Sequence, residues 1–237
     1  MAVNKVLSSF SEAVADIRDG ASIMLGGFGG PGGMPSRLIV ALRDLGARDL
    51  TIISNTAGLP GFGAKAGEEA TNMSILFENR QVSKAIATFP VPRSASVDTP
   101  FQKRLRAGEV EPEVGPHGTL VERIRAGGAG IPAFYTPTGL GTPLAEGKEH
   151  REFDGRHYLL EHALRADYAL IRAHTSDAWG NLTYKGTSRT FNPTMATAAD
   201  VTIAEVDEIV ELGNLNPESV VTQGIYVDRI VSRETRS

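Results

Sequence analysis

The sequence has 237 residues, of which 41% are apolar, and it carries a formal charge of -4. This length and composition are sufficient for one large α/β domain or two small ones, and the absence of any basic run argues against a nucleic acid partner. The absence of cysteine excludes disulfides and a cysteine nucleophile, and the five histidines are too far apart in sequence to predict a metal site.

The first predicted element is a short helix near the N-terminus. The run Phe10-Ser11-Glu12 has the pattern of a hydrophobic staple followed by a helix cap, and Val14 and Ile17 supply one apolar face that stops at Gly20. No apolar run reaches the length of a membrane-spanning helix, and the first residues do not resemble a signal peptide. These features predict no membrane segment and, by default, a cytoplasmic location.

The next elements alternate between strand and helix. Residues 22–25 form a compact apolar run that predicts a strand buried on both faces, and a glycine-rich loop, 26–33, follows it directly. Pro35 suits the first turn of a helix that ends at Gly46, and residues 50–54 form the next strand. The pattern recurs at 85–89, 168–173 and 201–205, which predicts an α/β fold built from right-handed βαβ units.

Two further segments are rich in glycine. Residues 58–69 predict a surface loop or an irregular helix start, and residues 127–141 predict a packed loop beside a site, because they are too apolar and aromatic for a linker. No internal repeat and no domain boundary is visible. We therefore expect residues 1–237 to form a single domain.

The loop after the first strand has two competing interpretations. Residues 27–32 match the G-x-G-x-x-G pattern of dinucleotide-binding proteins, but Pro31 has no amide hydrogen to donate, and the second strand ends in Ser54-Asn55 without the acid that would hold a ribose. More generally, glycines at the carboxyl end of a buried strand allow a ligand to approach the backbone and its amides. A purely structural turn is the remaining alternative.

Several motifs in sequence order resemble family I coenzyme A transferases. The first spans residues 19–28 together with Gly33-Met34-Pro35, and others lie at 54–55, 118–130, 136–139, 145–149, 170–174, 179–184, 191–193 and 208–211. The resemblance covers nearly the whole chain. Within the family, it points to the A subunits of the succinyl-CoA:3-oxoacid and 3-oxoadipate transferases, whose fold is a three-layer α/β/α domain around a mostly parallel sheet.

The resemblance implies an enzyme that moves coenzyme A between an acyl-CoA and a short-chain oxo or dicarboxylic acid, with coenzyme A as co-substrate and no permanently bound cofactor. In this family a glutamate forms a mixed anhydride and then a glutamyl thioester, and that glutamate belongs to a B subunit. The chain is therefore expected to be active only with a B subunit, in an A2B2 assembly. A related acyl-CoA hydrolase, a non-catalytic subunit that binds CoA esters, and a nicotinamide enzyme remain alternatives.

The resemblance also implies site residues. The coenzyme-binding loop corresponds to Gly26, Gly27, Phe28, Gly29, Gly30, Gly32 and Gly33, although four residues stand between Phe28 and Gly33 where the family usually has three. Where the family often has Pro-Gln-Gly, this chain has His117, which we predict to be an oxyanion donor or a contact for the substrate carboxylate. Asn55, just past the second strand, is predicted to bind substrate.

Overall fold

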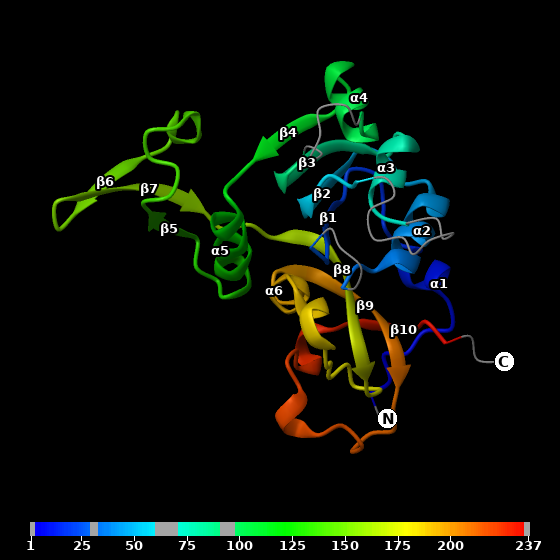
Figure 1. Ribbon diagram of the computed structural model, residues 1–237. Coiled ribbons are helices and arrows are strands. Elements are labelled where there is room, and N and C mark those ends of the chain that lie inside the picture. The colour runs from blue at the N-terminus through cyan, green and yellow to red at the C-terminus, as the bar shows by residue number, and fades with distance from the viewer. Residues whose placement is uncertain (1–2, 29–32, 60–70, 91–97, 235–237) are drawn as a thin grey trace.

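The computed structural model describes residues 3–28, 33–59, 71–90 and 98–234. Within these residues the strands form a seven-stranded sheet, in the order β10-β9-β8-β1-β2-β3-β4, and a separate three-stranded sheet, in the order β5-β7-β6. Every neighbouring pair in the larger sheet is parallel. This confirms the predicted α/β class with a mostly parallel sheet (Figure 1).

The centre of the large sheet is β1, Ser22–Leu25, which lies between β2, Leu50–Thr56, and β8, Ala166–Ser176. Ile23 and Leu25 pack into one hydrophobic cluster, and Met24 packs into another on the opposite face. All three side chains are fully buried. The short apolar run therefore forms a strand buried on both faces, as the sequence predicts.

One face of the sheet is covered by four helices: α1, Phe10–Val14; α2, Ser36–Leu45; α3, Ser74–Glu78; and α4, Pro100–Arg106. α2 ends at Gly46, as predicted, and Gly46 adopts the left-handed conformation. The boundaries predicted for α1 were wrong. Its cap is Ser9, whose hydroxyl accepts a hydrogen bond from the amide of Glu12, and the helix ends at Val14, well before Gly20.

The opposite face is covered by α5, His117–Gly128, and α6, Asn192–Ala196, which completes the three-layer α/β/α arrangement. The remaining strands of the large sheet are β3, Val82–Phe89; β4, Glu111–Val114; β9, Ala199–Ile209; and β10, Arg229–Ser232. Short 3-10 helices lie at Pro143–Ala145, Gly186–Arg189, Pro217–Ser219 and Gly224–Tyr226.

The small sheet is antiparallel and stands off the rest of the molecule (Figure 1). It consists of β5, Ala133–Thr136; β6, His150–Phe153; and β7, Arg156–His162. We call residues 133–162 the arm. The packed loop predicted for 127–141 was therefore wrong, because this segment contains the end of α5 and all of β5. Hydrogen bonding to β7 turns the apolar and aromatic residues 133–136 into a strand.

Two further predictions concern the segment 58–69 and the absence of a membrane-spanning helix. Nearly all of the segment 58–69, predicted as a surface loop, lies outside them. Among the helices that the structure describes, none has both the length and the apolar character needed to cross a bilayer.

Candidate active site

The path of the chain places a reversal point at the carboxyl end of β1. From β1 the chain proceeds to β2, β3 and β4 on one side, and it then returns through α5 and the arm to β8 on the other side of β1. Ligands of open α/β sheets bind at such a reversal point, outside the carboxyl ends of the strands. The predicted coenzyme-binding loop begins at this point.

The described parts of that loop are its two ends. The amide of Gly26 donates to the carbonyl of Leu170 over 3.0 Å, so Gly26 still belongs to the sheet. Gly27 and Gly33 have φ angles of +103° and +74°, which favour glycine. Gly29, Gly30 and Gly32 lie outside the described residues.

Asn192 joins both ends of the loop. Its Nδ2 donates to the carbonyl of Gly33 over 2.8 Å, and its Oδ1 accepts from the amide of Arg172 on β8 over 3.1 Å. A Cβ on Gly26 would lie only 1.8 Å from the same Oδ1. The side chain is fully buried, so it fixes where the loop leaves and re-enters the sheet. Sequence reasoning gave Asn192 no role beyond its place in a motif.

His117 lies against this loop. Its ring centroid is 4.8 Å from that of Phe28 and 5.0 Å from that of Phe191, and the rings of Phe28 and Phe191 are 5.7 Å apart. Phe191 is buried, whereas Phe28 is 48% exposed. The structure therefore brings together two predicted site residues that are far apart in sequence, at a place that is open to a ligand.

Asn55 lies at the same edge of the sheet, at the carboxyl end of β2. It is 3% exposed, and its carbonyl and side-chain oxygens are each 2.8 Å from the hydroxyl of Thr88 on β3. These contacts hold the side chain across two strands. Its predicted role in substrate binding stays a prediction.

The first turn of α2 is already occupied by a carboxylate of the chain itself. Glu205 accepts hydrogen bonds from the amides of Arg37 and Leu38, over 2.9 and 3.1 Å, and pairs with Arg233. Burial raises the pKa of Glu205 even though Arg233 opposes this shift. In a dinucleotide-binding fold these amides would face the pyrophosphate. The nicotinamide interpretation therefore loses its main structural requirement.

Beside this carboxylate, a charged network spans the ends of β8, β9 and β10. Asp207 is 2.8 Å from Nη2 of Arg172, 3.3 Å from Nδ1 of His174 and 3.6 Å from Nε of Arg233. Burial acts to raise the pKa of Asp207, but its hydrogen bond to Arg172 and the other contacts outweigh burial and hold the pKa below its usual range. The network fastens the three strand ends to one another.

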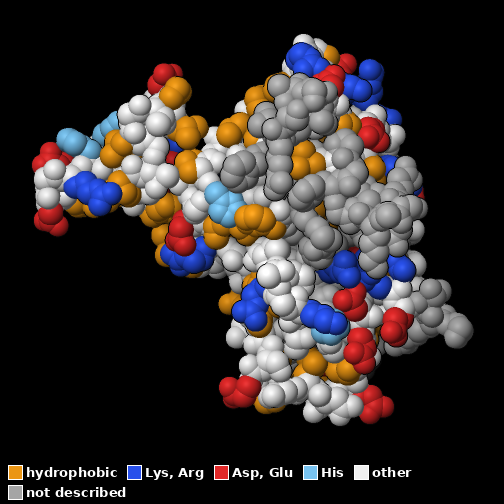
Figure 2. Space-filling view, in the orientation of Figure 1, with side chains coloured by type: hydrophobic (Ala, Val, Ile, Leu, Met, Phe, Trp, Pro, Cys, Tyr) orange, Lys and Arg blue, Asp and Glu red, His pale blue; other side chains and the backbone are white. Residues whose placement is uncertain are grey.

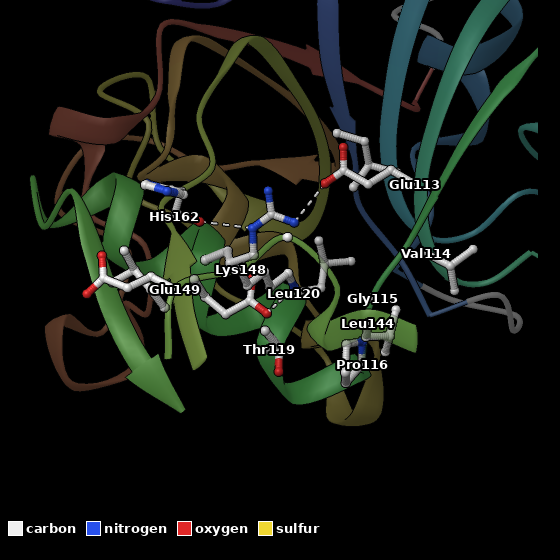
Figure 3. Close-up of a pocket in the computed structure, with 15 residues that line it drawn as sticks. Glu113, Val114, Gly115, Pro116, Thr119, Leu120, Leu144, Lys148, Glu149 and His162 are labelled. Atoms are coloured by element: carbon white, nitrogen blue, oxygen red, sulfur yellow. Dashed lines mark hydrogen bonds and ion pairs between the residues drawn. The ribbon is translucent and has the colours of Figure 1, made fainter. Parts of the chain in front are cut away.

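A cavity of about 610 Å³ lies between α5 and the base of the arm (Figure 3). Leu120, Leu144 and Leu160 contribute apolar lining. Arg123 crosses the cavity, donating to Glu113 on β4 over 2.8 Å and to the carbonyl of His162 on β7 over 2.9 Å. The cavity also borders Pro116, the residue before His117.

Among the described residues, no group of three or more histidines and acids could hold a metal ion. The candidate site therefore consists of a glycine loop with fixed ends, a partly exposed aromatic ring and a histidine beside it.

An open α/β fold with a glycine loop at its reversal point belongs to a class of proteins whose ligands bind outside the carboxyl ends of the strands. The sequence profile of the coenzyme A transferase family matches residues 7–233. The chain is 51% identical to the A subunit of 3-oxoadipate CoA-transferase from Pseudomonas putida, over 97% of its own length and 94% of that protein. It belongs to the coenzyme A transferase family.

Other comparisons agree with this assignment. The chain is 45% identical to the A subunit of a probable succinyl-CoA:3-ketoacid coenzyme A transferase from Bacillus subtilis, over 97% of this chain and 90% of that protein. Its fold matches an acyl-CoA transferase from E. coli, solved as a thioester complex with CoA, with a TM-score of 0.79 and 27% identity. That match covers 99% of this chain but only 48% of the E. coli protein, so the chain spans about half the length of that structural relative.

Proposed function

We propose that this chain is the A subunit of a 3-oxoacid coenzyme A transferase of the succinyl-CoA:3-oxoacid or 3-oxoadipate type. Full-length similarity to A subunits with both names supports the reaction class. The names of these relatives also support a B-type partner, for which an A2B2 assembly is our working arrangement. The single structural observation that carries the proposal is the contact of His117 with Phe28 at the end of the glycine loop.

The proposed chemistry divides the reaction between two chains. A glutamate carboxylate of the partner attacks the acyl carbonyl of the donor acyl-CoA and releases the CoA thiolate, leaving a mixed anhydride. The thiolate attacks the glutamyl carbonyl and releases the donor acid, which leaves a glutamyl thioester. The acceptor acid then reverses both steps. The partner's glutamate is regenerated, and CoA ends on the acceptor.

This chain would supply the wall of that site. Each attack places negative charge on a carbonyl oxygen, and a donor fixed beside that oxygen lowers the barrier. His117 is proposed as that donor, or as a contact for the substrate carboxylate, and Asn55 as a second substrate contact. The loop from Gly26 to Gly33 is proposed to contact coenzyme A. The anhydride also requires that water be excluded, so in this proposal the partner chain covers the exposed ring of Phe28.

The test uses the chain purified together with the B-type chain from the same genome. Transfer of CoA from succinyl-CoA to 3-oxoadipate or acetoacetate is measured with and without added acid, because a hydrolase would consume thioester without the acid. Borohydride trapping should label a glutamate of the partner and none of this chain. A label on this chain, or full turnover without the partner, would refute the division of labour.

The role of His117 is tested by a matched pair of variants. His117→Gln keeps a hydrogen-bond donor and should retain most turnover, whereas His117→Ala should lower kcat by about 100- to 1000-fold, the range for one oxyanion donor. Equal kcat in the wild type and the alanine variant would eliminate the role.

A further inference from the structure

The two faces of the arm differ in what covers them. Residues directly opposite in antiparallel strands share a face, and Tyr135 pairs with Leu160, Arg151 with Tyr158, and Phe153 with Arg156. Leu160, Tyr158 and Arg156 alternate along β7, so all six residues lie on one face. We call Tyr135, Arg151, Phe153, Arg156 and Tyr158 the arm face.

The opposite face is covered by the chain itself. Leu159 is fully buried there, and a Cβ on Gly139 would lie 3.5 Å from its Cδ1, so the segment after β5 packs on it. Lys148 also forms an ion pair with Glu161, which is 4% exposed. This side of the small sheet thus has its own small core.

The arm face carries three aromatic rings in a row. The centroids of Tyr135 and Phe153 are 5.3 Å apart, and those of Phe153 and Tyr158 are 5.5 Å apart, both edge to face. Phe153 is 40% exposed. Figure 2 shows that the arm stands off the body with a hollow at its base, and Tyr135 and Tyr158 are half-buried.

Two guanidinium groups lie on these rings. Arg151 stands 5.2 Å from the centroid of Phe153 and 5.9 Å from that of Tyr135, and Arg156 stands 5.7 Å from that of Tyr158. None of the ion pairs formed among the described residues includes Arg151 or Arg156, and the acid beside this face, Glu149, accepts a hydrogen bond from the hydroxyl of Tyr135. A guanidinium already placed over an aromatic ring loses little further freedom when it binds a carboxylate. Tyrosine, phenylalanine and arginine are also enriched in protein interfaces.

A second copy of this chain does not fit the arm face. A two-fold dimer through this face would bring together two copies of a surface on which Arg151 and Arg156 outnumber Glu149, and like net charge opposes that contact. Contact with a different surface of a second copy is heterologous, and it gives an open filament unless the rotation between copies happens to close a ring. The cationic and aromatic character of the face instead fits a different protein that presents carboxylates.

The position of the arm face favours one such protein. Leu160 shares the face and lines the cavity at the base of the arm, and the same cavity borders Pro116, directly before His117. A protein lying on the arm face would therefore border the helix that carries His117. We infer that the arm face is the docking surface for the B-type subunit, which contacts Arg151 and Arg156 through carboxylates. This inference rests on the proposed pairing with a B-type chain.

The experiment measures binding separately from turnover. The dissociation constant between this chain and the B-type chain is measured for the wild type, for Arg151→Glu with Arg156→Glu, and for Arg18→Glu with Arg48→Glu as a control that makes the same charge change on exposed arginines outside the arm. Reversing charges that face carboxylates should raise Kd by at least about 100-fold and lower kon, whereas the control should change Kd less than about threefold. Unfolding curves confirm that both variants are folded.

The outcomes distinguish this inference from the proposed function. Wild-type affinity in the arm variant overturns the inference, as does a wild-type pair that does not associate. A dimer of this chain alone that dissociates in the arm variant assigns the face to a second copy and also overturns it. If the wild-type pair binds, the arm variant does not, and CoA transfer is absent, the docking surface stands and the proposed function fails. His117→Ala should bind the partner with unchanged affinity.

Discussion

Replacing Asn192 by alanine tests how the glycine loop is held. The substitution removes the partners of the Gly33 carbonyl, 2.8 Å away, and of the Arg172 amide, 3.1 Å away. Leaving a buried backbone group without a partner costs about 1 to 3 kcal/mol. Two such groups lose their partners, and solvent can reach part of this region and reduce the loss. We therefore expect Asn192→Ala to lower the free energy of unfolding by about 2 to 4 kcal/mol.

A second substitution makes the prediction sharper. In Gly26→Ala the new Cβ would lie 1.8 Å from Oδ1 of Asn192, and forcing a methyl group into such a space costs about 1 to 3 kcal/mol. The φ angle of Gly26 is not positive, so alanine suits the backbone. Once Asn192 is alanine, the next contact of this methyl group is the carbonyl of Leu170 at 3.4 Å, an ordinary distance.

The double variant should therefore be about as stable as Asn192→Ala alone. This corresponds to a coupling energy of about 1 to 3 kcal/mol in favour of the pair. Urea unfolding of the four proteins in the cycle, each purified in the same form, gives this value directly. Simple additivity of the two losses would refute the reasoning, because it would mean that Asn192 does not occupy the space beside Gly26.

Two other changes test the packing of α5 and the charges at its base. A Cβ on Gly128 would lie 2.1 Å from Oγ1 of Thr197, so Gly128→Ala should lower the free energy of unfolding by about 1 to 3 kcal/mol in urea. Burial acts to raise the pKa of Glu113, but Arg123 and Lys84 outweigh it and lower the pKa. The stabilisation is complete above the unfolded pKa, about 4.3, and is lost as the pH falls through the lower folded pKa. Arg123→Gln should flatten the loss of stability below about pH 4.3, and an unchanged slope in acid unfolding curves would contradict this.

The central strands were predictable from the sequence because a strand that is buried on both faces needs a short run of apolar residues. Residues 22–25 and 50–54 are mostly apolar, and the structure places them in β1 and β2. The edge strand β4 has the sequence Glu-Pro-Glu-Val and is largely exposed, so its composition carries no such signal. The same holds for β6, in which all four residues are exposed. Pairing rather than composition makes these segments strands: β4 pairs with β3, more than twenty residues earlier, and β6 pairs with β7 across the two-residue turn at Asp154 and Gly155.

Individual residues of the site were predictable from the sequence, but the contacts between them were not. The glycines after β1 and the histidine at the start of α5 could be singled out from the sequence. Their contact depends on α5 crossing the face of the sheet after β4, which places His117 against Phe28. Asn192 offered no local signal, because a buried asparagine in a short helix looks like a turn residue until Gly26 and Gly33 are seen on either side of it.

The two halves of the chain contribute differently to this site. Asn192 lies in the half of the chain that follows the arm, and it holds the glycine loop. His117 lies in the half before the arm, directly after β4. The position of His117 relative to the loop therefore depends on how α5 packs on α6. That packing is close at Gly128, where a Cβ would overlap Thr197. A methyl group there should move α5 away from α6 and loosen the contact of His117 with Phe28, so Gly128→Ala should lower kcat as well as stability, even though Gly128 lies at the far end of the helix.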